Sequence, residues 1–189
     1  MQAVEDVKKL LPKHTGLIET TDILDLIKTF ANTWFHLESY DENTLPLKGF
    51  TQKDLKLQSA ELLRDIINFK QELQNKGQAS DLFAREKRQK SLEGVFGNIF
   101  QSFDGIDVYS SIEEKAAHFL YFIVKNHLFT DGNKRIGAFS FIWFLSKVEY
   151  NFRDTISPEA LTVMTLLVAE SNPKDKDRIV GLIILLLGK

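Results

Sequence analysis

The chain of 189 residues carries 24 Lys and Arg against 26 Asp and Glu, a net charge of −2, and it contains no Cys. Its 43% hydrophobic and 26% charged residues are typical of a soluble globular protein and exclude a disordered or collagen-like chain. The absence of Cys excludes disulfides, thiol nucleophiles and cysteine metal sites, and the near-neutral charge argues against nucleic acid and anionic membranes as partners.

The N-terminus has no basic region followed by an apolar stretch, so the sequence predicts no secretory signal. The longest apolar runs, residues 136–145 and 179–187, are much shorter than the roughly 20 residues of a membrane helix. We therefore expect no membrane partner and a cytoplasmic location. Secretion into a host by a route without a signal stays open.

Helical spacing of apolar residues through Trp34 predicts a first helix that begins at Thr21 and ends in the polar loop of residues 39–44. A second helix is expected to begin at Thr51, as N-cap with Asp54 three residues on, and to stop at Gly77. A third is expected after Ser80, carrying the basic residues of positions 85–90 on a solvated face.

Residues 98–109 give the β signal of the chain, with Asp104 and Gly105 as the turn of a hairpin. Two strands alone make no core, so the hairpin must lie on helices. Ser110 followed by Glu113 predicts a capping box and a helix to about residue 126.

The next predicted helix, from Asn133 or Lys134, is so apolar that it should be buried on nearly all sides. Ser157 and Pro158 open another, with Leu161, Met164, Leu167 and Val168 inward, and the residues after Asn172 form the last, to about Gly188. The fold class expected is all-α, a helical bundle with one inserted β-hairpin. Nine of the fifteen Phe lie in residues 96–144, which indicates dense packing there.

Residues 127–135, with the sequence HLFTDGNKR, combine four chemical features between the two most aromatic helices. His127 offers an imidazole that can act as a general base near neutral pH. Asp131 offers a carboxylate suited to Mg²⁺. Gly132 and Asn133 place backbone N–H groups at a helix N-terminus, where anions bind, and Lys134 and Arg135 add two cations. Taken singly, each has an ordinary structural explanation, but together they favour phosphoryl or nucleotidyl transfer.

The pattern His-x-Phe-x-Asp-Gly-Asn-x-Arg, flanked by helices and preceded by a hairpin, resembles the core of the Fic/Doc family (filamentation induced by cAMP, death on curing). With the segments around it, it is similar to the Fic domain of RhuM-like bacterial virulence-associated proteins. The resemblance covers residues 82–189. It implies a Fic-type helical bundle in which residues 81–189 form the catalytic core and residues 1–80 a helical extension packing on it.

The resemblance also implies roles for individual residues. His127 would deprotonate a Ser, Thr or Tyr hydroxyl of a target protein, and Asp131 would hold Mg²⁺ on the phosphates of ATP. The backbone at Gly132, Asn133 and Lys134, with the Asn133 side chain, would form an anion hole, and Arg135 would pair with a phosphate. Phe129 would be a structural anchor of the loop. The hairpin would be a flap that aligns the target by strand addition, formed by Ile99, Phe100, Gln101, Ser102, Phe103, Asp104, Gly105 and Ile106.

Two departures from the pattern of AMP-transferring members keep the reaction open. Lys134 stands where a glycine is typical, and Ala138 stands where a second arginine is typical. The Asn-Lys-Arg variant resembles the death-on-curing toxin, which transfers the γ-phosphate. AMPylation, γ-phosphate transfer and a catalytically weakened interaction module are therefore three alternatives.

The partners expected are a nucleotide and a target protein with a hydroxyl side chain. The inhibitory pattern of the family, Ser/Thr-x-x-x-Glu-Gly/Asn, does not occur in the sequence. Regulation would then come from a partner protein or from a homo-oligomer. A nucleic-acid binder that uses Arg85, Lys87, Arg88 and Lys90 has the least support.

Overall fold

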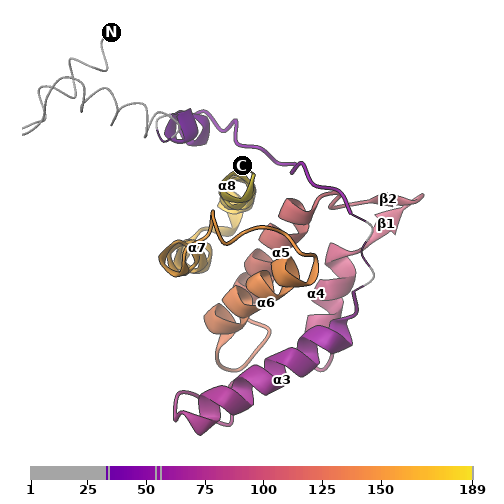
Figure 1. The fold of residues 1–189 in the computed structure, drawn as a ribbon, viewed down its shortest axis with the longest axis vertical. Coiled ribbons are helices and arrows are strands. Elements are labelled where there is room, and N and C mark those ends of the chain that lie inside the picture. The colour runs from indigo at the N-terminus through magenta and orange to yellow at the C-terminus, as the bar shows by residue number, and fades with distance from the viewer. Residues whose placement is uncertain (1–32, 34, 54, 56, 189) are drawn as a thin grey trace, which may run out of the picture. The chain divides into compact units, whose positions relative to one another are not determined.

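A computed structural model describes residues 33, 35–53, 55 and 57–188 (Figure 1). The chain divides into two compact units, Met1–Thr44 and Leu45–Lys189. In the first, residues 35–41 are helical. Most of the predicted helix from Thr21 lies outside the described residues, and the assignment of residues 1–80 to an extension stays a prediction.

The second unit is mostly helical, and its elements agree with the all-α class containing one hairpin. They are α3 (Ser59–Asn75), α4 (Ser91–Ile99), β1 (Ser102–Phe103), β2 (Ile106–Asp107), α5 (Ile112–Lys125), α6 (Asn133–Lys147), α7 (Pro158–Glu170), the 3₁₀ turn η1 (Pro173–Asp175) and α8 (Lys176–Leu187). None of the described helices has the length and apolar character needed to cross a membrane.

Helix α5 is the centre of this unit and contacts α4, α6, α7 and α8 (Figure 1). It is buried on nearly all sides because its neighbours cover even its charged residues. Its apolar residues Ala116, Phe119, Leu120 and Ile123 are fully buried. Phe119 joins Phe96, Phe100 and Phe144 in one aromatic cluster, which accounts for part of the phenylalanine excess.

Several predicted helix ends are confirmed. Helix α6 begins at Asn133, and Ser157 caps α7 by accepting a hydrogen bond from the Ala160 N–H. Helix α5 has a capping box, but its residues are Ser111 and Glu114, one position later than predicted. The shift matters because it frees Glu113 to accept hydrogen bonds from Thr51 and Tyr150.

Three predictions about local structure are wrong. Thr51 does not cap a helix, because its N–H and hydroxyl bind the Glu113 carboxylate and α3 begins only at Ser59. Residues 81–90 form turns and isolated bridges instead of a helix. On α7, Leu167 faces outward and is 41% exposed, whereas Met164 and Val168 are buried as predicted.

The hairpin is shorter than predicted. Ile99 ends α4 and is fully buried, and only Ser102–Phe103 and Ile106–Asp107 pair as strands. The turn is as expected, with positive φ at Asp104 (49°) and Gly105 (77°). The nearly buried Lys115, in the first turn of α5, donates to Asp107 at 2.8 Å and fixes the hairpin on that end of the helix.

Candidate active site

Two side chains of the loop between α5 and α6, those of Phe129 and Asn133, hold the loop in its conformation. Phe129 is fully buried and anchors the loop in the core, the place proposed for it from the sequence. The Asn133 side chain binds the Phe129 backbone twice: its Oδ1 accepts from the Phe129 N–H at 2.9 Å, and its Nδ2 donates to the Phe129 carbonyl at 2.7 Å. The Asn133 amide therefore shapes the loop rather than facing outward.

A second segment, residues 83–87, is hydrogen-bonded to the loop through turns and two isolated bridges. The Ala84 N–H donates to the Asp131 carbonyl (3.2 Å), and the Lys87 N–H donates to the Leu128 carbonyl (2.8 Å). In the other direction, the Thr130 N–H donates to the Arg85 carbonyl (2.8 Å). The segment that the sequence wrongly assigns to a helix is thus the immediate neighbour of the motif.

The turn into α6 depends on Gly132. Its φ is 87°, a region that L side chains rarely adopt, and a Cβ atom there would lie 2.3 Å from Cε2 of the fully buried Phe83. Phe83 in turn packs against Phe69 and carries the Arg135 guanidinium, whose carbon lies 4.5 Å from the ring centroid. Phe83 therefore supports both the turn and a cation of the motif.

Substituting Gly132 with alanine is expected to lower the free energy of unfolding by about 2–4 kcal/mol. Positive φ costs a non-glycine residue roughly 1 kcal/mol, and displacing Phe83 from a packed core adds about 1–3 kcal/mol. Urea unfolding measures the loss. Gly94→Ala is the matched control, because a Cβ at that helical position meets nothing within 4 Å and should stabilise slightly. If the two variants were equally stable, the role given to Gly132 in the turn against Phe83 would be wrong.

The first turn of α6 presents backbone amides without acceptors. Within the part of the chain that the structure describes, the N–H groups of residues 132–135 donate to no protein atom. Such amides carry the positive end of the helix dipole and bind anions. Helix α6 has no acidic residue in this turn to compete for them.

The charged side chains around these amides are held by protein partners. Arg135 donates to the Gln78 carbonyl at 2.8 Å and lies 3.6 Å from the Asp131 carboxylate. Lys134 forms an exposed ion pair with Glu170 of α7 at 3.4 Å. Exposed pairs of this kind are worth little, so a phosphate at the amides can displace them.

The Asp131 carboxylate is half-exposed, one turn before Arg135 on the same side of the loop. Among the described residues, no group of three acidic or histidine side chains surrounds it. A single carboxylate fits the usual way in which Mg²⁺ binds with a nucleotide, where phosphate oxygens and waters complete the coordination.

His127 follows the last turn of α5 with a φ of 48°, and its side chain is exposed. Left-handed backbone costs a histidine roughly 1 kcal/mol, and strain of this kind gathers at functional sites. The imidazole opens into a cavity of about 380 Å³ lined also by Lys87, Arg88, Ser91, Asn126 and Leu128.

The structure does not bring the proposed flap to this loop. The hairpin lies at the N-terminal end of α5, whereas the loop follows its C-terminal end, about 21 Å away for a 14-residue helix (Figure 1). Ile99 is buried and Phe100 stacks on Phe96, so neither is free to align a target. Residues 102–106 of the hairpin are exposed, and Phe103 and Ile106 are its most exposed apolar side chains, at 73% each. The backbone beside the motif belongs to residues 83–87 instead.

Phe83 and Glu86 support the site, although no sequence pattern indicates them. Glu86 caps α4 by accepting hydrogen bonds from the Leu92 N–H (2.7 Å) and the Ser91 hydroxyl (3.0 Å). No local signal marks this contact, because the N-cap residue, Lys90, makes no side-chain cap hydrogen bond and Glu86 lies outside the cap positions.

Comparison with known proteins gives one match. The family model described as Fic/DOC family matches residues 50–145, which is half of the chain and includes α3 to most of α6. Searches of the curated proteins and of the solved structures gave no significant match.

Proposed function

The chain belongs to the Fic/DOC family, and from this premise we propose that it moves AMP, or another phosphate-containing group of ATP, to a hydroxyl of a target protein. Membership indicates a Fic-type transferase in general terms. The observation that carries the finer proposal is the row of unpartnered amides at residues 132–135, which follows a loop that begins with an exposed histidine.

In the proposed reaction, His127 takes the proton of a Ser, Thr or Tyr hydroxyl as the hydroxyl oxygen attacks phosphorus. Attack at the α-phosphorus forms a phosphodiester and releases pyrophosphate. The amides of residues 132–135 stabilise the negative charge that develops on the phosphate oxygens, and Arg135 adds a positive charge beside them. The amides are already oriented by the loop, so they need no rearrangement to act, whereas Arg135 would exchange its contact with Asp131 for the phosphate.

Asp131 is the residue that would hold Mg²⁺ on the phosphates. When bound, the ion neutralises charge on the transferred group. The ion pair between Asp131 and Arg135, at 3.6 Å, competes with Mg²⁺ for the carboxylate. A phosphate that binds Arg135 would replace the carboxylate as its partner and leave Asp131 available to the ion.

A second candidate, γ-phosphate transfer with release of ADP, is favoured by the surroundings of Lys134 and Ala138. Both line a cavity of about 210 Å³ between α6 and α7, together with Arg135 and residues of α7. The small Ala138 leaves room where the family pattern has a second arginine. An interaction module with weakened activity is the third candidate.

The test is transfer to proteins of a cell lysate from ATP labelled either at the α-phosphate or at the γ-phosphate. Label kept only from the α-position means AMP transfer, and label kept only from the γ-position means phosphorylation. Retention of neither label, at a protein concentration where nucleotide binding is saturated, would contradict the transferase proposal and favour the interaction module.

A further inference from the structure

The cavity at His127 has a strongly positive lining. Besides the histidine it is bounded by the cations Lys87 and Arg88 and by the uncharged residues Ser91, Asn126 and Leu128. Both cations are exposed, and neither forms an ion pair with any residue that the structure describes. No carboxylate contributes to its lining.

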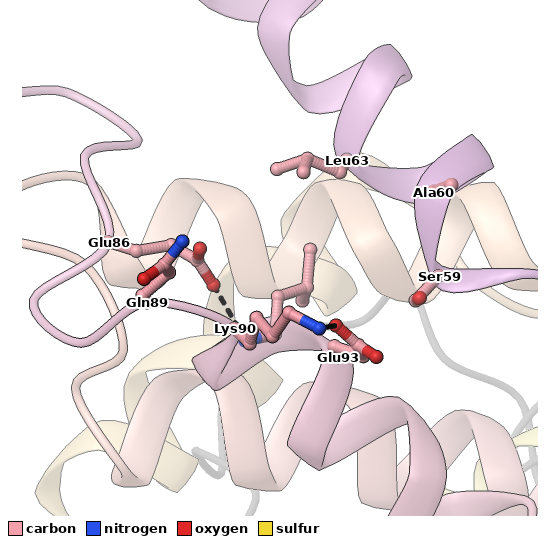
Figure 2. A pocket seen from close by; sticks show the side chains of 8 residues that line it. Ser59, Ala60, Leu63, Glu86, Gln89, Lys90 and Glu93 are labelled. Atoms are coloured by element: carbon pink, nitrogen blue, oxygen red, sulfur yellow. Dashed lines mark hydrogen bonds and ion pairs between the residues drawn. The ribbon is translucent and has the colours of Figure 1, made fainter.

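The other side of the same segment holds two carboxylates, Glu86 and Glu93, and one cation, Lys90. A second cavity of about 370 Å³ lies between α3 and α4, and Figure 2 shows its side chains. Lys90 is paired there with Glu93 at 3.4 Å, and the Glu86 carboxylate is directed to the start of α4 (Figure 2). The acids of this region are therefore engaged on the α3 side, and the two free cations line the His127 side.

The positions of Lys87 and Arg88 are fixed relative to the motif. The Lys87 N–H donates to the Leu128 carbonyl, next to His127, and the Arg88 carbonyl accepts from the Ser91 N–H at 3.2 Å. The two side chains thus start from an ordered backbone that is hydrogen-bonded to the loop. Such a pair can recognise charge at a defined place beside the base.

This cavity is separate from the one at the start of α6. The cavity bounded by Lys134, Arg135 and Ala138 shares no lining residue with the cavity at His127. In the proposed function, the phosphates of the nucleotide bind to the amides and cations at the start of α6. The cations at His127 are left for the other reactant, the segment that carries the hydroxyl.

We propose that Lys87 and Arg88 select the target, by binding carboxylates that flank the hydroxyl presented to His127. The substrate class is a protein segment in which Ser, Thr or Tyr stands among Asp and Glu. This inference rests on the proposed function for the role of His127, but the binding of acidic segments is measurable without any transfer. Lys87 and Arg88 are positioning residues, since they contact the flanks and not the reacting atoms.

The test uses the full chain and short fluorescent peptides with a central tyrosine flanked by glutamates, by glutamines or by lysines. We expect the glutamate peptide to bind more tightly than the other two, and its affinity to fall as salt is added. Lys87→Glu/Arg88→Glu should weaken its binding about tenfold or more, because two attractions of exposed charges become repulsions. The same variant should improve binding of the lysine peptide.

The matched control is Lys48→Glu/Arg153→Glu, which changes the net charge equally at two exposed positions that line neither cavity. It should bind all three peptides as the wild type does. Equal losses in both double variants would reduce the effect to net charge and overturn the proposal.

Further outcomes separate this inference from the proposed function. Charge-selective peptide binding that depends on residues 87 and 88 supports the inference even if no transfer is found. Transfer that does not discriminate among the peptides in wild type and variant would overturn it while leaving the function intact. The inference would also be overturned if Lys87→Glu/Arg88→Glu weakened the binding of ATP, or of a DNA oligonucleotide, and left the binding of the glutamate peptide unchanged. The two cations would then bind another ligand.

Discussion

Replacing His127 with alanine is expected to reduce the rate of transfer by about 10²–10⁴-fold, the usual contribution of a positioned general base. The variant should still fold and bind nucleotide, because the side chain is exposed and the amides of residues 132–135 are untouched. Transfer from labelled ATP measures the rate, and nucleotide titration measures binding. His36→Ala removes a partly buried histidine outside the motif and should have the wild-type rate.

His127→Gly separates chemistry from backbone strain. It should be as inactive as His127→Ala but more stable by about 1 kcal/mol, because glycine adopts the positive φ of this position without penalty. A wild-type rate in either variant would remove His127 from the proposed mechanism.

The free energy of unfolding is expected to fall in acid through His118. Burial, with a smaller effect of the Lys176 charge, lowers the pKa of His118 from 6.5 to about 4. The ring stacks on Tyr109 with centroids 3.8 Å apart, and its Nδ1 donates to the Glu114 carbonyl at 2.8 Å. The carboxylates of Glu114 and Asp177 also act on it, and they oppose the shift.

The direction follows from proton binding. Between pH 6.5 and about pH 4 the unfolded chain protonates this imidazole and the native state does not, so acid favours unfolding. The contribution is complete above pH 6.5 and is lost on the way to about pH 4, for a total of about 3 kcal/mol.

Urea unfolding at about pH 7.5 and about pH 5 should show this loss, amounting to about 2 kcal/mol between the two. His118→Phe is the comparison, because phenylalanine keeps the aromatic contacts with Tyr109 and Phe122 and does not titrate. The variant should lose about 2 kcal/mol less than the wild type over the same interval. An identical pH dependence of both proteins would show that His118 is not the group responsible.

The helices around the motif could be predicted because their signals are local. Apolar residues recur at helical spacing along α5, and Ser157 with Pro158 marks the start of α7. The functional loop is likewise one contiguous pattern, so residues 127–135 could be chosen without a structure.

The surroundings of the loop could not be predicted in the same way. Residues 83–87 contain no glycine or proline and have good helix formers, yet they form turns and two isolated bridges, because they pair with residues 128–131 far along the chain. Phe83 fills the space left by Gly132, a fit between distant positions that no spacing rule indicates. The family resemblance implies a flap formed by the hairpin, but α5 separates the hairpin from the motif.

The Asn133 side chain forms two hydrogen bonds with the Phe129 backbone, and residues 128–131 pair with residues 84–87. This ordering of the loop has a thermodynamic consequence. Ordering one residue of a flexible backbone costs roughly 1–2 kcal/mol in conformational entropy. Here that cost is met when the protein folds rather than when a ligand arrives. In the proposed reaction, the loop would receive the substrate with little further ordering, and the interaction energy would be left for affinity and for stabilising the transition state.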